Sequence, residues 1–423
     1  MLELGILADD LTGGMMVASL LEREGVRCPL VTSPDALDTL SADAKAVVIG
    51  RKIRLIPADE ARADATRSAM ALRAIKTKRI YYKYCATFDS TEEGNIGPIT
   101  EALMEALDTD RTIVCPAFPE YSVTIFQGRL FLGSTPLGDS FKQHDPVTPM
   151  TNSNLVEVMQ AQAHGKVGLL PHGTLIKGKA VTSDAIDKQV KAGISMFVID
   201  AVDDDDATRI AELVTDWPLS TGADAMPMFL ARTFHQEEIA EQRTLLPPSP
   251  GGEAVIAGSC APNTLAQTAY FEQQHAVYRI DLIEAKGDTA ILSKIEQWAK
   301  ENLDEGPVAV ATSADVAGVE RAQAELGRDG AAALADELLG KSAKLLHNLG
   351  VRKFVVAGGE TSGQVFNSLE IEQVQVSAFD NLSGGYCHEA GDAPTSLVTK
   401  AGALGDETFF FTALERMRQA DNA

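Results

Sequence analysis

The stretch GILADDLTGG, residues 5–14, places two adjacent carboxylates, Asp9 and Asp10, where an apolar strand is expected to turn into a helix. Asp10 or Thr12 alone would suffice to cap such a helix by accepting hydrogen bonds from its free N–H groups. The second carboxylate then lacks a structural reason. Carboxylates placed beside a bound polar molecule can accept a proton from it, so this pair is the first candidate for chemistry.

Cations follow other expected strands in the same half of the chain. The segment GRKIR supplies Lys52 and Arg54, and YYKYCATFDST supplies Lys83. From the pattern alone, a strand lysine such as Lys83 is usually an ordinary edge or face residue. Carboxylates together with lysine and arginine suit a small polar acid and a proton that has to be moved.

The second half places small residues and hydroxyls after its expected strands. The stretches are AGSCAPNT at 257–264, VVAGGETSGQVF at 355–366 and TKAGALG at 399–405. Backbone N–H groups at a glycine-rich helix start can hold a phosphate, although a plain tight turn would also favour these glycines. The P-loop-like ADELLGKSA, 335–343, lacks the first glycine and a preceding strand, and its leucine spacing predicts an amphipathic helix.

These residues require alternating strands and helices to position them. Strands are predicted near 3–9, 28–32, 46–51, 79–85, 112–118, 197–202, 254–258, 276–282, 307–312, 353–357, 373–378 and 397–401. Helical patterns lie between most of them, which indicates parallel sheets whose ligands bind beyond the carboxyl ends of the strands.

The proline- and glycine-rich segment 243–255 predicts a linker. We therefore expect two α/β domains, 1–240 and 253–423, each a largely parallel sheet flanked by helices. Carboxylates and cations on one domain, facing phosphate-binding turns on the other across a cleft, describe a phosphotransferase.

Composition narrows the class of protein. The 423 residues carry a net charge of -23, which argues against nucleic-acid or membrane binding and requires local cations if the substrate is an anion. The sequence offers no apolar run long enough to span a membrane and no secretion signal, and its five scattered cysteines suit reduced thiols, so we expect a cytoplasmic protein. No zinc-type spacing is present, and a homodimer is the base-rate expectation.

Five segments together resemble the four-carbon acid sugar kinases, most closely the 3-oxo-tetronate kinase branch. They are ILADDLTGG, YYKYCATFDSTEEGNIGPITEAL, DPVTPMTNSNLV, AGSCAPNTLAQ and VVAGGETSG, collinear from residue 3 to about 412. The resemblance implies a sugar-acid-binding N-terminal domain and an ATP-binding C-terminal domain. It also implies transfer of phosphate from ATP to the terminal hydroxyl of a small sugar acid in carbohydrate acid catabolism, an alcohol-acceptor phosphotransferase.

Residue by residue, the resemblance implies ATP contacts at Ser259, Gly358, Gly359, Glu360, Thr361 and Gly402. It implies substrate contacts at Lys52, Arg54 and Lys83, with Arg54 and Lys83 gripping the substrate carboxylate. Asp10 is expected to be the base and Asp9 to orient it or hold Mg2+, and the reverse assignment is also open.

The chain departs from the family pattern in the sugar-binding half. Met16 stands where an aspartate is expected, Val123 replaces an arginine, and STGADAMP at 220–227 replaces a glycine-rich GGSGL. Losing both partners of an ion pair costs less than losing one. A wider, more apolar pocket would suit a branched acid such as 3-oxo-isoapionate, and a non-catalytic sugar-acid sensor is a further alternative. A dehydrogenase is disfavoured because no GxGxxG follows an early strand.

Overall fold

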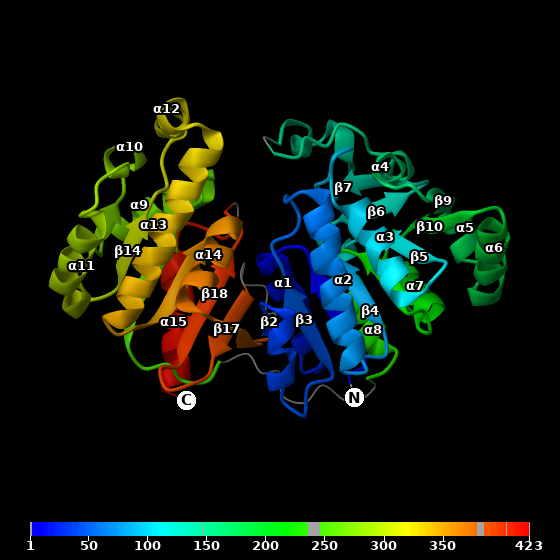
Figure 1. The fold of residues 1–423 in the computed structure, drawn as a ribbon, viewed down its shortest axis with the longest axis horizontal. Coiled ribbons are helices and arrows are strands. Elements are labelled where there is room, and N and C mark those ends of the chain that lie inside the picture. Colours follow the sequence, from blue (N-terminus) through cyan, green and yellow to red (C-terminus); the bar gives the residue numbers. More distant parts are fainter. Residues whose placement is uncertain (1, 146, 236–245, 379–384, 403, 423) are drawn as a thin grey trace. The chain divides into compact units, whose positions relative to one another are not determined.

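The computed structural model describes residues 2–145, 147–235, 246–378, 385–402 and 404–422. Its contacts divide the chain into two units, Met1–Gln242 and Arg243–Ala423. In each unit, strands pair largely in parallel and helices lie beside them (Figure 1), so the predicted fold class of two α/β domains is confirmed. The predicted linker, 243–255, lies partly outside the described residues.

The N-terminal unit is built on buried apolar strands that pair in parallel throughout. In spatial order they are β2 (Leu30–Val31), β3 (Ala46–Gly50), β1 (Leu4–Ala8), β4 (Ile80–Lys83), β11 (Leu219–Gly222), β5 (Thr112–Cys115), β10 (Ile194–Ile199) and β9 (Lys166–Leu170). Because most of these strands are buried on both faces, they read as continuous apolar runs rather than as alternating patterns, and β11, with the sequence LSTG, is an exception.

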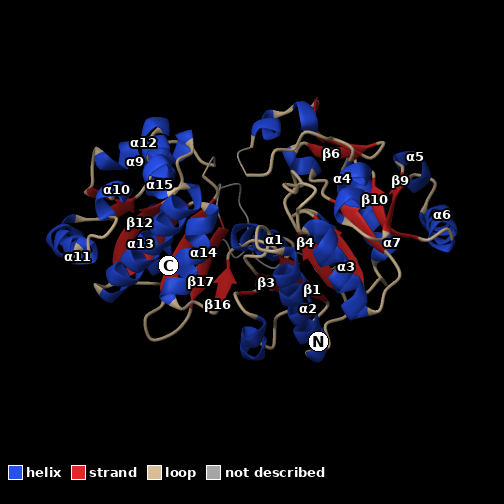
Figure 2. Cartoon of the chain, turned by 45° about the horizontal axis from the view of Figure 1, so that its top comes forward, coloured by secondary structure: helices blue, strands red, loops and turns tan. Residues whose placement is uncertain are grey.

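Helices flank this sheet in two groups (Figure 2). Helix α2 (Ala58–Ala74) packs on α3 (Ile96–Leu107), which packs on α4 (Leu155–Gln162), while α8 (Met226–Arg232) packs on α1 (Leu11–Arg23) and α7 (Asp204–Val214). Helices α5 (His172–Leu175) and α6 (Lys179–Lys191) follow β9, and β6 (Val123–Phe126), β7 (Arg129–Leu132) and β8 (Thr135–Pro136) form a small antiparallel sheet.

The strand order creates a topological switch point between β1 and β4. The chain leaves β1 through α1 toward β2 on one side, and leaves β4 through α3 toward β5 on the other. Right-handed crossovers then place α1 and α3 on opposite faces of the sheet. Ligands of open α/β sheets bind in the crevice that such a divergence leaves at the carboxyl ends of the strands.

The C-terminal unit has a mostly parallel sheet in which only β17 runs antiparallel to its neighbours. In spatial order its strands are β13 (Val277–Arg279), β14 (Val308–Ala311), β12 (Gly252–Ala257), β15 (Val351–Ala357), β18 (Thr395–Lys400), β17 (Gly385–Glu389) and β16 (Gln373–Val376). Its helices are α9 (Pro262–Glu272), α10 (Leu282–Ala285), α11 (Ile291–Asn302), α12 (Val316–Leu326), α13 (Arg328–Asn348), α14 (Gly359–Leu369) and α15 (Phe409–Asp421).

Two details bear on the sequence predictions. Residues 335–343 lie inside α13, so the rejection of a P-loop there is confirmed. Strand β11, with only the four residues LSTG, was not predicted, because its serine, threonine and glycine give no apolar signal. Within the described ranges, no helix is both long enough and apolar enough to cross a membrane.

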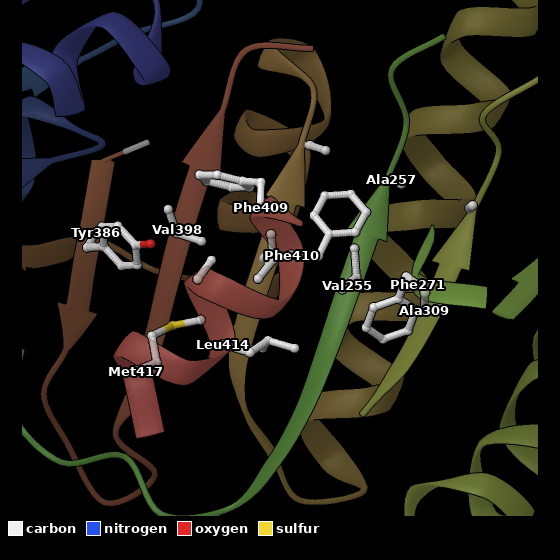
Figure 3. Packing of buried hydrophobic residues seen from close by; sticks show 14 residues of the cluster. Val255, Ala257, Phe271, Ala309, Tyr386, Val398, Phe409, Phe410, Leu414 and Met417 are labelled. Atoms are coloured by element: carbon white, nitrogen blue, oxygen red, sulfur yellow. The ribbon is translucent and has the colours of Figure 1, made fainter. Parts of the chain in front are cut away.

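The apolar core of the C-terminal unit forms where α15 packs on its sheet. Phe410, Leu414 and Met417 of α15 lie beside Val255 and Val398 of the strands (Figure 3). These side chains are fully or almost fully buried. Burying aromatic and aliphatic surface in this way is the dominant stabilising contribution to such a unit.

Replacing Phe410 by Ala removes the most enclosed aromatic ring of α15 and leaves a cavity. We expect the full-length chain to lose about 3–5 kcal/mol of unfolding free energy in its C-terminal transition, measured by urea denaturation. Gln419→Ala, an exposed change on the same helix, is the control and should stay within about 0.5 kcal/mol of wild type. Equal effects of the two substitutions would contradict this description of the core.

Candidate active site

The switch point gathers charged residues from four neighbouring strand ends. In the registers of β1, Ala8 lies opposite both Gly50 of β3 and Lys83 of β4, and Lys83 also lies opposite Gly222 of β11. The segments that follow these positions carry Asp9, Asp10, Arg54 and Asp224. Together with Lys83 these residues form what we call the charged cluster: Asp9, Asp10, Arg54, Lys83 and Asp224.

Arg54 joins the two adjacent carboxylates. Its Nε donates to Asp9 Oδ2 at 2.9 Å and its Nη2 to Asp9 Oδ1 at 2.8 Å, which is a bidentate fork. The same Nη2 lies 2.7 Å from Asp10 Oδ1. The guanidinium of Arg54, which was expected to grip a substrate carboxylate, is therefore directed to Asp9. The Nη1 of Arg54 has no hydrogen-bond partner among the described residues.

Asp10 caps a helix and also pairs with the cations of the charged cluster. Its Oδ2 accepts from the backbone N–H of Gly13 at 3.0 Å and caps α1. Its Oδ1 accepts from Arg54 and from Lys83 Nζ, the latter at 3.2 Å. Burial would raise the pKa of Asp10, but the charges of Arg54 and Lys83 outweigh burial and hold that pKa well below its ordinary value.

Lys83 is almost completely buried at the end of β4. Its Nζ lies 3.2 Å from Asp10 Oδ1 and 3.4 Å from Asp224 Oδ1. Burial would lower the pKa of Lys83, but these carboxylates keep it above the ordinary lysine value. Gly13 leaves space for the ammonium group of Lys83, because a Cβ on residue 13 would lie 1.6 Å from Lys83 Nζ.

Asn95 positions the loop that carries Arg54. Its Nδ2 lies 2.9, 3.2 and 2.8 Å from the carbonyl oxygens of Ile53, Arg54 and Ile56. Lys52 lies on the same loop but is exposed, whereas Arg54 turns inward. The structure therefore brings Asp9, Asp10, Arg54 and Lys83 together and leaves Lys52 at the surface.

Asp224 is the residue that the sequence reasoning missed. The segment 220–227 was noted only as a departure from a glycine-rich pattern, and β11 was not recognised. An acidic residue two positions after a strand that pairs with β4 is the signal that could have found it, once that strand is known.

In the C-terminal unit, three adjacent strand ends carry the residues expected to contact a nucleotide. Ser259 follows β12, Gly358 follows β15 and Gly402 follows β18. A Cβ on Gly402 would lie 1.9 Å from Ser259 Oγ, so only glycine allows these two turns to approach. Gly358 has φ +132°, a backbone conformation that favours glycine.

The start of α14 is open at its first turn. No side chain caps this helix, and a Cβ on Gly359 would meet no atom within 4 Å. Glu360 is exposed, whereas Thr361 is buried and its hydroxyl donates to Asp336 at 3.4 Å. The hydroxyl of Ser362 donates to the carbonyl of Gly358 at 2.7 Å. Backbone N–H groups, rather than these hydroxyls, are thus the groups suited to an anion.

Lys400, the last residue of β18, is fully buried beside these turns. Its Nζ donates to Thr264 Oγ1 at 3.0 Å and to the carbonyl of Gly402 at 3.1 Å. The part of the chain that the structure describes supplies no carboxylate to pair with it. Burial lowers the pKa of Lys400 from 10.5 to about 8.

The depressed pKa of Lys400 predicts a pH-dependent stability. The unfolded chain binds this proton more tightly than the folded chain, so the folded state carries a penalty below pH 8 that is relieved as the pH rises toward 10.5. Relative to Lys400→Met, wild type should therefore gain about 1 kcal/mol of unfolding free energy between pH 7 and pH 9 in urea denaturation. Lys286→Met removes the same charge at an exposed site, where the difference from wild type should stay flat. If the difference in unfolding free energy between wild type and Lys400→Met also does not change with pH, the prediction is wrong.

Two domain models match the chain: a sugar-binding N-terminal domain over residues 4–230 and a nucleotide-binding C-terminal domain over residues 254–410. The 3-oxo-tetronate kinase of Pseudomonas fluorescens is 37% identical over 98% of this chain and 97% of its own length. The protein of the same name from Salmonella typhimurium is 34% identical over 98% of this chain and 99% of its own.

Two crystal structures share the whole fold. One from Salmonella typhimurium LT2, which carries a provisional description as a tRNA synthase, has a TM-score of 0.84 and 34% identity over 98% of this chain and 99% of its own. One from Haemophilus influenzae has a TM-score of 0.77 and 31% identity over 98% of this chain and 100% of its own. Both the sequence and the fold therefore agree over nearly the full length, and the chain belongs to the four-carbon acid sugar kinase family.

Proposed function

We propose that this protein is an ATP-dependent kinase that phosphorylates the terminal hydroxyl of a 3-oxo-tetronate, a four-carbon sugar acid, in carbohydrate acid catabolism. The observation that carries the proposal is the charged cluster at the switch point of a domain that matches a sugar-binding model, in a chain whose full-length relatives are named for this activity. An alcohol group is the acceptor that this substrate offers.

On the sugar side, cations and carboxylates have separate tasks. The free Nη1 of Arg54, the exposed ammonium of Lys52 and the ammonium of Lys83 are the groups that would hold the substrate carboxylate and its oxygens. Asp9 and Asp10 hold Arg54 and Lys83 in place, and a carboxylate of the charged cluster takes the proton of the attacking hydroxyl. Positioning and charge neutralisation are most of what phosphoryl transfer requires of a protein.

On the nucleotide side, the backbone N–H groups of Gly359, Glu360 and Thr361 at the start of α14 would hold phosphate oxygens. Ser259, Gly358 and Gly402 form the adjoining turns, where the two glycines let the chain segments approach closely. The buried Lys400 adds positive charge behind Gly402, and no carboxylate in the described residues neutralises it.

Mg2+ fits this site as a partner of the nucleotide rather than as a metal held by the protein alone. In the described residues no three acidic, histidine or cysteine side chains are grouped to hold a metal. Mg2+ characteristically binds through substrate phosphates and one or two carboxylates, and the exposed Glu360 is the acidic side chain at the start of α14. When bound, the ion would neutralise phosphate charge.

The alternatives are less favoured. The relatives from Pseudomonas fluorescens and Salmonella typhimurium are both named for 3-oxo-tetronate, not for a branched acid. Val123 is buried on β6 and Met16 is partly buried on α1, so both departures from the family pattern are places for apolar packing. A sensor without turnover would not require both Asp9 and Asp10 together with an open phosphate turn.

A coupled assay of ADP release tests the proposal. Purified protein with ATP and Mg2+ should turn over a linear 3-oxo-tetronate faster than linear tetronates, 2-oxo-tetronates or branched apionate-derived acids. Turnover confined to a branched acid would instead assign Met16 and Val123 to a changed specificity. ATP binding without turnover of any acid would favour the sensor.

Arg54→Lys should separate the role of the fork from that of charge. Lysine keeps the charge but cannot make the bidentate contact with Asp9, so we expect kcat/KM for the sugar acid to fall about 10- to 100-fold with the KM for ATP unchanged. Arg129→Lys, an exposed change on β7, is the matched control. If both variants behave like wild type in steady-state kinetics, the Arg54 fork is not part of the substrate site.

A further inference from the structure

The transfer of a phosphoryl group to a hydroxyl needs an acceptor for the hydroxyl proton. Such an acceptor should offer a carboxylate oxygen that does not already accept a hydrogen bond from another residue, and its pKa should not lie far below the working pH. Asp9 fails the first condition, because both of its oxygens accept from Arg54 and its side chain is almost fully buried.

Asp10 fails both conditions. One of its oxygens accepts from the N–H of Gly13, and the other accepts from Arg54 and Lys83. These donors hold its pKa well below the ordinary value, which makes Asp10 a weak base.

Asp224 meets both conditions. Its carboxylate contacts Lys83 Nζ at 3.4 Å through Oδ1, and the described residues offer it no other side-chain donor. Burial raises its pKa above the ordinary aspartate value; Lys83 opposes this shift and Asp10 adds to it. The other titratable groups that face it are the phenols of Tyr81 and Tyr121.

The turn that carries Asp224 is held on several sides. The hydroxyl of Tyr81 donates to the carbonyl of Ala223 at 2.7 Å, and the N–H of Tyr84 donates to the carbonyl of Gly222 at 3.0 Å. A Cβ on Gly222 would lie 2.2 Å from the carbonyl oxygen of Cys115, so the chain packs closely there. This packing fixes Asp224 beside Lys83 before any ligand binds.

We propose that Asp224, rather than Asp10 or Asp9, is the catalytic residue that accepts the proton of the substrate hydroxyl. The inference rests on the proposed kinase function. As the hydroxyl oxygen forms its bond to the γ-phosphorus of ATP, its proton passes to a carboxylate oxygen of Asp224. The bond from that phosphorus to the bridging oxygen breaks, and its electron pair leaves with ADP. Lys83 stays charged and paired with Asp10 throughout.

Asp224→Asn tests this assignment in the full-length protein with ATP, Mg2+ and the best acid of the panel. We expect kcat to fall 100-fold or more with KM changed less than about threefold. Because the base must be deprotonated, wild-type kcat should rise with pH through the pKa of Asp224, above 3.8, and the variant should lose this rise. Asp224→Glu should restore part of kcat and of the pH dependence.

Two further variants make the result decisive. Asp216→Asn changes an exposed aspartate just before β11 and should keep wild-type kinetics. Asp10→Asn should raise KM, because it releases Arg54 and Lys83, but should keep the rise of kcat with pH. If Asp10→Asn removes that rise and Asp224→Asn keeps it, the base is Asp10 and the proposal is wrong.

Failure of the kinase function itself would look different. Wild type would then release no ADP with any acid of the panel. A melting temperature of Asp224→Asn within a few degrees of wild type shows that lost turnover is not lost folding. If Asp224→Asn loses turnover and also melts at a much lower temperature, Asp224→Glu becomes the test. A folded Asp224→Glu variant whose kcat does not rise with pH would overturn the proposal.

Discussion

The burial of a single ammonium group, that of Lys83, is the constraint on which the N-terminal site depends. A charge removed from water has to be paired and hydrogen-bonded, because unpaired burial costs several kcal/mol. Asp10 and Asp224 pair it, and Gly13 leaves the space that it occupies. Asp9 and Arg54 complete the arrangement, so each member of the charged cluster is held by another.

The strand ends of the C-terminal unit differ from this arrangement, because their buried cation is not paired with a carboxylate of the described residues. They present glycines, backbone N–H groups and one buried lysine. Such a surface carries uncompensated positive character, which suits an anionic ligand, whereas the charged cluster, with three carboxylates and two cations, has a formal charge of -1. The overall charge of -23 makes this local contrast more important, because the field of the whole chain repels anions.

Much of this could be predicted from the sequence, since apolar strands buried on both faces give a strong local signal. The βαβ alternation fixed the fold class, and the rule that ligands bind at strand ends selected Asp9, Asp10, Arg54 and Lys83. The partners of these residues could not be predicted, because pairing depends on strand order. Asp224 lies about 140 positions from Lys83 in the chain and becomes its neighbour only through β11, whose four residues carry no apolar pattern. The direction of the Arg54 fork toward Asp9 and the loop contacts of Asn95 likewise depend on tertiary structure.

We propose that the charged cluster is where the sugar acid binds. A crystal structure of the full-length protein with a 3-oxo-tetronate and a non-hydrolysable ATP analogue tests it most directly. We expect the acid at the carboxyl ends of β1 and β4, with its terminal hydroxyl within about 3.2 Å of a carboxylate of the charged cluster. An acid bound away from Arg54 and Lys83, with the charged cluster unchanged, would contradict it.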